Sequence, residues 1–161
     1  MAGFVKALEG AGCSSARTVG ASGNAVVEAS ARVTDPQLER MLEMAVSQSA
    51  GLVTVAFVRD RPAWQALVEA NPFVREAVDD PAHLVVTVLR SHPPPSRWSA
   101  LKGAIVGRER LAEGDRCAYL VYPDGIGRSK LTAAAIERAL GVPGTSRNWN
   151  TVRTLLQLVA E

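Results

Sequence analysis

The residues best suited to bind an anion lie in the stretch Tyr122-Pro123-Asp124-Gly125-Ile126-Gly127-Arg128-Ser129-Lys130, between a predicted strand and a predicted helix. Free backbone amides at a helix start attract anions, and glycine lets a backbone approach a phosphate closely. Arg128 adds a forked donor that suits phosphate or carboxylate. The stretch therefore predicts a ligand site, with the amides of Gly127 and Arg128 on phosphate. Its members are Asp124, Gly125, Gly127, Arg128, Ser129 and Lys130.

The same stretch also has a purely structural interpretation. Pro123-Asp124-Gly125 is typical of a tight turn, and Ser129 would then cap the following helix. The stretch is not a P-loop, because Gly127 is followed by Arg128-Ser129 where that motif needs Lys and then Ser or Thr. Both interpretations stay open from the sequence.

A second donor-rich stretch, Arg147-Asn148-Trp149-Asn150, comes at the predicted start of the last helix. Arg147 would hold a phosphate, Asn148 and Asn150 would orient the ligand, and Trp149 would stack on a base or sugar. In the alternative interpretation Asn148 caps the helix and Trp149 covers the edge of the core. We favour that alternative for Trp149 and leave Arg147 undecided.

No catalytic constellation is visible elsewhere. His83 opens a predicted buried strand and is interpreted as structural, and His92 beside three prolines as part of a surface loop. No serine lies in a GxSxG sequence. Cys13 and Cys117 lack the spacing of metal ligands and are interpreted as reduced thiols. Neither a metal nor a cofactor is predicted.

Three functions are consistent with these residues. The leading hypothesis is a binding protein whose partner is a nucleotide or nucleic acid, held by its phosphate groups. A small enzyme acting on a phosphorylated metabolite is the second, and it would gain support if Asp124 had a strongly perturbed pKa in a cleft. The third is a structural or assembly module with no ligand. Whether the protein is an enzyme stays open.

Composition bounds the class of protein. The chain has 161 residues, of which 47% are hydrophobic and 21% charged, as in an ordinary globular protein. A formal net charge of +2 does not by itself argue for nucleic acid. No stretch approaches the ~18 apolar residues of a membrane span, and the N-terminus does not resemble a signal peptide. We expect a soluble cytoplasmic protein.

Local patterns predict the elements that position these residues. Residues 91–99 contain three consecutive prolines and are predicted to form an irregular loop. Strands and helices intermingle without strict alternation, which indicates an α+β fold with a mainly antiparallel sheet and helices on one face. Helices are predicted near residues 4–11, 35–50, 60–71, 130–140 and 148–160, and strands near 17–19, 25–29, 52–58, 83–89, 105–111 and 117–122.

In order and spacing, four motifs resemble a bacterial family, the domain of unknown function 1697. They are Ser22-Gly23-Asn24, Glu69-Ala70-Asn71-Pro72-Phe73, the stretch Pro123 to Leu131, and Arg147-Asn148-Trp149-Asn150-Thr151-Val152. The resemblance implies two ferredoxin-like halves, each a small sheet with helices on one face. These would be residues 1–60 and residues 61–161, the latter including the C-terminal helix. It implies no activity.

The N-terminus departs from the pattern of that family. Its members usually open with a further strand and an Arg-Gly-Ile-Asn-Val-Gly-Gly type turn, whereas this chain reaches its first helix by Phe4. The first strand of a ferredoxin-like half is central, so its loss would leave unpaired backbone groups in the sheet. Our favoured hypothesis is a translation start upstream of Met1. The alternatives are a rearranged half or one completed by a partner, and a homodimer stays open.

Overall fold

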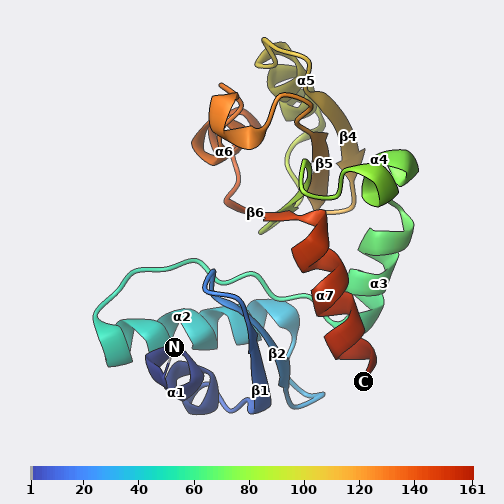
Figure 1. The fold of residues 1–161 in the computed structure, drawn as a ribbon. Coiled ribbons are helices and arrows are strands. Elements are labelled where there is room, and N and C mark those ends of the chain that lie inside the picture. The colour runs from blue at the N-terminus through green and yellow to red at the C-terminus, as the bar shows by residue number, and fades with distance from the viewer. Residues whose placement is uncertain (1) are drawn as a thin grey trace. The chain divides into compact units, whose positions relative to one another are not determined.

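A computed structural model describes residues 2–161, whose elements fall into two compact units (Figure 1). Unit 1 comprises the residues up to Trp64 together with Thr154–Glu161, and unit 2 comprises Gln65–Arg153. Each unit combines helices with an antiparallel sheet, which confirms the predicted α+β class. Within the described residues, no helix is both long and apolar enough to cross a membrane.

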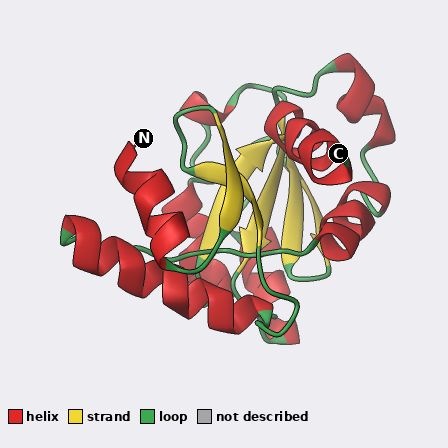
Figure 2. Ribbon diagram, turned by 90° about the horizontal axis from the view of Figure 1, so that it is seen from below, coloured by secondary structure: helices red, strands yellow, loops and turns green. Residues whose placement is uncertain are grey.

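Unit 2 is built on an antiparallel sheet, drawn in yellow in Figure 2. Its four strands have the order β4-β5-β3-β6. Two helices are inserted between its strands, so that the chain runs β3-α5-β4-β5-α6-β6. This β-α-β-β-α-β order is the one that a ferredoxin-like half has. The elements are β3 (Leu84–Leu89), α5 (Pro95–Gly103), β4 (Arg110–Gly114), β5 (Cys117–Val121), α6 (Ala133–Leu140) and β6 (Gly144–Asn148).

Both faces of the unit 2 sheet are covered. Every residue of β3 is buried, as its continuous apolar run predicts. On one face, side chains of β3 and β5 pack with Leu101 of α5 and Ile136 of α6. On the other, the Tyr119 hydroxyl donates a hydrogen bond to the Leu67 carbonyl at 2.6 Å. Leu67 belongs to α3 (Arg61–Glu69), which the short helix α4 (Val74–Asp79) follows.

Unit 1 has a smaller sheet and a smaller core. Its elements are α1 (Ala2–Gly10), β1 (Ser14–Val19), β2 (Asn24–Glu28) and α2 (Asp35–Ala50), and β1 and β2 form a two-stranded antiparallel sheet. Leu8, Cys13 and Leu38 are the buried residues of its core. A two-stranded sheet is marginally stable alone, so the helices must supply much of the stability of this unit.

Three sequence-based predictions of elements are wrong. Residues 52–58 form no strand, because they pair with no neighbouring strand among the described residues. The N–H groups of Ala56 and Val58 donate instead to carboxylates of α2. The proline-rich loop ends at Pro95, which begins α5, since proline suits the first turn of a helix. The strand predicted over 105–111 begins only at Arg110.

Two elements were not predicted at all, the short helix α4 and the strand β6. The strand β6 has the sequence Gly-Thr-Ser-Arg-Asn, which was interpreted as part of the approach to the last helix. These residue types favour turns over strands. Pairing with the buried strand β3 makes the segment a strand, and the last helix, α7 (Trp149–Ala160), follows it directly.

Candidate functional site

The two donor-rich stretches meet at one end of the unit 2 sheet. β5 and β6 both end beside the first residues of β3. The turn before β3 holds both stretches, because the Tyr122 N–H donates to the His83 carbonyl at 2.9 Å and the Trp149 N–H donates to the Pro81 carbonyl at 3.2 Å. The sheet therefore brings together residues that are far apart in the sequence.

The stretch after β5 is a loop, and not the start of a helix. Residues Ile126–Arg128 form a single 3-10 turn, and α6 begins only at Ala133. Thr132 caps α6 by accepting the Ala135 N–H, so Ser129 is not the cap. The prediction that the amides of Gly127 and Arg128 lie at a helix N-terminus was therefore wrong.

Asp124 forms an ion pair with Arg108, in which the guanidinium Nε lies 3.0 Å from a carboxylate oxygen. The hydrogen bond from Arg108 holds the pKa of Asp124 below its usual range, and the charges of Arg108 and Arg128 add to this effect. A general base that works near neutral pH needs a raised pKa. Asp124 is better suited to position Arg108 than to accept a proton.

Ser129 is engaged inside the loop. Its hydroxyl donates to the Glu109 carboxylate and accepts the Leu131 N–H at 3.0 Å. The hydrogen bond from Ser129 lowers the pKa of Glu109, so this carboxylate is ionised at neutral pH. The second oxygen of Glu109 is buried without a hydrogen-bond partner among the described residues. Glu109 therefore fixes the loop through its hydrogen bond with Ser129, and its second oxygen is not available to a ligand.

Two cations of the loop remain available to a ligand. Arg128 and Lys130 are exposed and make no hydrogen bond or ion pair with any residue that the structure describes. Gly125, with a φ of 86°, turns the backbone toward His83, since a β-carbon there would lie 3.9 Å from the His83 Nε2. Arg128 and Lys130 are therefore the hydrogen-bond donors of the candidate site.

Sequence reasoning missed two members of this site. The His83 side chain is 40% exposed, and its Nδ1 lies 2.8 Å from the Asp80 carboxylate. It was interpreted as structural because it precedes a buried strand. Arg108 is separated from Asp124 by a complete β-hairpin, and nothing in the local sequence pairs them. The concentration of arginines between Arg90 and Arg116 was the available signal.

In the second donor-rich stretch, Arg147 and Asn148 make hydrogen bonds within the fold. Arg147 is half-buried on β6, and its guanidinium donates to the Thr145 hydroxyl at 2.6 Å and the Ser146 carbonyl at 2.9 Å. Burial lowers the pKa of Arg147. Asn148 accepts the Thr151 N–H at 3.1 Å and so caps α7. Asn150 lies exposed in the first turn of that helix.

Trp149 is 4% exposed and lines an open groove of about 320 Å³. The valines of this groove make it largely apolar. The lining residues are Val68, Glu69, Asn71, Val74, Ala77, Val78, Trp149 and Arg153.

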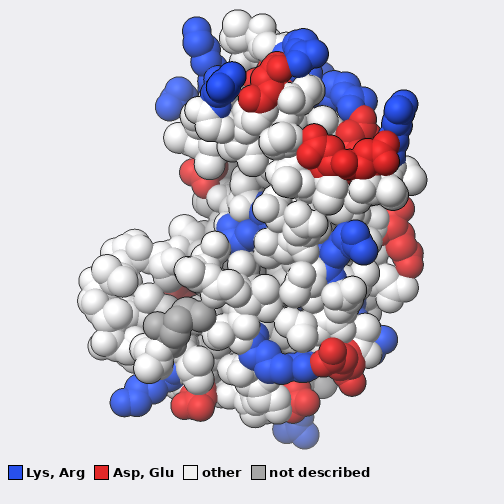
Figure 3. Space-filling model, viewed as in Figure 1, with Lys and Arg blue, Asp and Glu red and all other residues white. Residues whose placement is uncertain are grey.

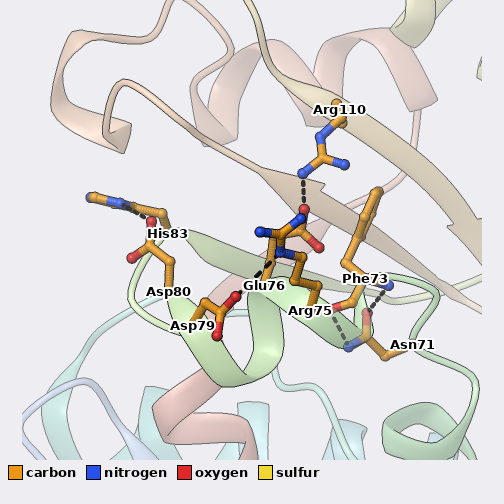
Figure 4. A network of polar contacts seen from close by, with 8 residues as sticks. All are labelled: Asn71, Phe73, Arg75, Glu76, Asp79, Asp80, His83 and Arg110. Atoms are coloured by element: carbon orange, nitrogen blue, oxygen red, sulfur yellow. Dashed lines mark hydrogen bonds and ion pairs between the residues drawn. The ribbon is translucent and has the colours of Figure 1, made fainter.

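Polar contacts hold α4 in place beside the groove (Figure 4). Arg110 of β4 forms an ion pair with Glu76 and lies over the Phe73 ring, 5.2 Å from its centroid. The Asn71 side chain accepts the Phe73 N–H at 3.0 Å, which fixes the turn before the helix. The wall that α4 contributes is thus anchored to the sheet.

Basic and acidic side chains alternate over the part of unit 2 that Figure 3 shows. On that face, the described residues form no broad basic surface of the kind that binds nucleic acid. Within the described residues, no three His, Cys, Asp or Glu side chains gather where they could hold a metal ion.

Fold and site together define an α+β protein with an arginine-bearing loop at the end of the antiparallel sheet of unit 2. The chain belongs to the family described as "Protein of unknown function (DUF1697)", which matches residues 1–119, and this confirms the resemblance. The match ends before Asp124, so membership does not rest on the two donor-rich stretches. No curated protein and no solved structure matches the chain.

Proposed function

We propose that the protein binds a phosphate-bearing ligand, a nucleotide or nucleic acid, at the loop after β5. The observation that carries this proposal is the pair of exposed cations Arg128 and Lys130, beside the ion pair of Arg108 with Asp124. A phosphate would join Arg128 and Lys130 directly. Arg108 has further guanidinium donors beyond those that Asp124 accepts.

The arrangement favours a small ligand over a long nucleic acid. The loop offers Arg108, Arg128 and Lys130 against the carboxylates of Asp124 and Glu109, so its local charge is only weakly positive. Non-specific nucleic-acid binding depends on many phosphate contacts. A nucleotide needs only one or two, and it could direct its base toward His83.

The residues of the second stretch have a supporting role in this proposal. Asn148 and Arg147 fix the end of β6 and the start of α7. The start of α7 holds the turn before β3, and that turn contacts the loop after β5. Substitution of Asn148 or Arg147 should lower stability and weaken binding together, whereas substitution of Arg128 should weaken binding alone.

The test is a titration of fluorescently labelled nucleotides, and of short single- and double-stranded DNA and RNA, at low and near-physiological salt. Arg128→Ala is expected to weaken binding roughly tenfold to a hundredfold, as for the loss of a charge-assisted hydrogen bond. Its melting temperature should be close to that of the wild type, because Arg128 makes no hydrogen bond or ion pair with any residue that the structure describes. The slope of affinity against salt reports how many phosphates are neutralised.

Arg138→Ala is the matched control, because Arg138 is another exposed arginine of unit 2, on α6. It should bind like the wild type. Equal affinities for the Arg128→Ala and Arg138→Ala variants, or no binding of any probe at low salt, would refute the proposal.

A further inference from the structure

The groove beside Trp149 lies within unit 2, and side chains of α3, α4 and α7 line it together with the turn between α3 and α4. Its volume of about 320 Å³ is at the lower end of the range for small-molecule sites. Val74 and Val78 of α4 line the groove and are 68% and 76% exposed. Exposed apolar side chains that gather along a groove mark a binding surface. The groove therefore has the size and the apolar wall of a site for a small ligand.

The indole N–H of Trp149 lacks an acceptor. Its side chain makes no hydrogen bond with any residue that the structure describes. Of the described side chains, only Glu109 has a polar atom that is both fully buried and without a partner. The indole nitrogen therefore keeps some contact with solvent, although Trp149 is only 4% exposed. Buried tryptophans usually satisfy this donor, so a ligand in the groove would supply the acceptor that the fold does not.

Arg153 adds a second available donor to the groove. It follows Trp149 by four residues on α7, and residues at this spacing are neighbours on a helix surface. Its side chain is exposed and lines the groove, and it makes no hydrogen bond or ion pair with any described residue. A guanidinium matches a carboxylate with two parallel hydrogen bonds. Both donors thus favour an anionic group at the α7 side of the groove.

The remaining polar side chains of the lining have partners. The Asn71 side chain accepts the Phe73 N–H at 3.0 Å and donates to the Phe73 carbonyl at 3.3 Å. Glu69 accepts a hydrogen bond from the Gln65 amide at 2.8 Å and forms no ion pair with Arg153. The carboxylate of Glu69 disfavours a second negative charge in the groove, so a ligand with one negative charge suits the lining better than a dianion.

We propose that this groove binds a small monocarboxylate with an apolar body. The carboxylate would accept hydrogen bonds from the Arg153 guanidinium and the Trp149 indole, and the hydrocarbon part would cover Val74 and Val78. A small molecule is the occupant because a partner protein would need a much larger surface than this groove offers. The site goes beyond the phosphate-bearing ligand of the loop after β5 and uses none of its cations.

Octanoate, a monocarboxylate with a hydrocarbon chain, tests the proposal in an NMR titration of the ¹⁵N-labelled protein. NMR is suited because a ligand of few atoms gains little binding free energy in total. The indole N–H signal of Trp149 should shift, and that of Trp98, which packs in the core of unit 2, should not. Octanamide has the same chain and a neutral head, and it should bind roughly tenfold more weakly. Acetate, which lacks the chain, should cause no shift.

Two substitutions in the groove should weaken octanoate binding roughly tenfold each. Arg153→Gln removes the cation, and Val78→Asp adds a negative charge to the apolar wall. Arg138→Gln and Val106→Asp are the matched controls and should bind octanoate like the wild type. Arg138 is an exposed arginine of α6, and Val106 is 76% exposed, as Val78 is, but lies outside the groove. All four side chains are exposed, so the variants should fold.

An indole signal of Trp149 that octanoate leaves unchanged would overturn the proposal. Equal affinities for octanoate and octanamide would also overturn it, because the carboxylate would then not be recognised. The same holds if Arg153→Gln binds octanoate as tightly as Arg138→Gln. None of these measurements involves a nucleotide, so their failure would leave the proposal for the loop after β5 unaffected.

Discussion

Units 1 and 2 both combine helices with an antiparallel sheet, but the sheet of unit 2 has more strands. Unit 2 has four paired strands, of which β3 is buried throughout and carries a partner on each side. Unit 1 has a two-stranded sheet, and an apolar stretch that would suit a strand lies exposed beside it. The comparison indicates that a central strand, paired on both sides, determines whether the apolar segments next to it are buried or exposed.

The largest expected effect breaks the core of the complete unit. Leu120 of β5 is fully buried, and Leu120→Ala should lower the free energy of unfolding by about 2–5 kcal/mol, as for other large-to-small core substitutions. Leu52→Ala is the contrast in unit 1, where the side chain is 61% exposed, and should change stability little. Urea denaturation followed by tryptophan fluorescence and circular dichroism measures both. Comparable losses would mean that Leu52 is buried in solution.

Gly125 tests the backbone on which the proposed site depends. A φ of 86° is in the region that glycine adopts freely and other residues adopt at a cost of roughly 1–3 kcal/mol. Gly125→Ala should therefore destabilise unit 2 by about that amount and weaken ligand binding. Gly127→Ala is the control, because the space beside Gly127 is open. If both variants melt at the same temperature, the loop has another conformation in solution.

A substitution of Glu39 tests how α2 holds residues 52–58 in place. The Glu39 side chain is buried, accepts the Val58 N–H at 2.9 Å, and lies 3.9 Å from the Arg59 guanidinium. Glu39→Ala would remove the acceptor of the Val58 N–H, at a cost of about 1–3 kcal/mol. Glu39→Gln keeps an oxygen acceptor and should cost less. Amide exchange at Val58 should be faster in the Glu39→Ala variant, and an unchanged rate would contradict this role.

The smallest expected effect is a dependence of unit 2 on acid pH. Hydrogen bonds from Arg110, Ser129 and Arg108 lower the pKa values of Glu76, Glu109 and Asp124, in that order. A lowered pKa in the folded state contributes stability above the unfolded pKa and loses it as pH falls through the folded value. Stability should therefore decline as the pH falls below about 4, near the ordinary carboxyl pKa. Denaturation of the Glu76→Gln variant should show a shallower decline, and an identical pH profile would contradict the role of Glu76.

The predicted elements succeeded where the local pattern agreed with the tertiary environment. The apolar run that became β3 predicted a strand buried on both faces, and the spacing of Val152 and its neighbours predicted α7. The prediction failed for residues 52–58, whose composition is that of a strand. A strand needs a neighbour to pair with, and no residue type supplies one.

The candidate site was predictable in part, for the same reason. Arg128 and Lys130 were identified because their local sequence carries glycines and cations together. His83 and Arg108 were not, because their relation to Gly125 and Asp124 exists only across the sheet. The local sequence does not decide the role of Arg147. In the fold its guanidinium donates to Thr145 and Ser146, because donors on a half-buried strand must be satisfied.

By itself, the sequence determined the α+β class, the buried central strand of unit 2 and the composition of the loop after β5. These properties follow from residue types and their spacing along the chain. Only the tertiary structure decided that a polar segment becomes β6, that residues 52–58 form no strand, and which cations remain available to a ligand. Strand pairing and side-chain satisfaction depend on residues distant in sequence, and local preferences cannot specify such partners.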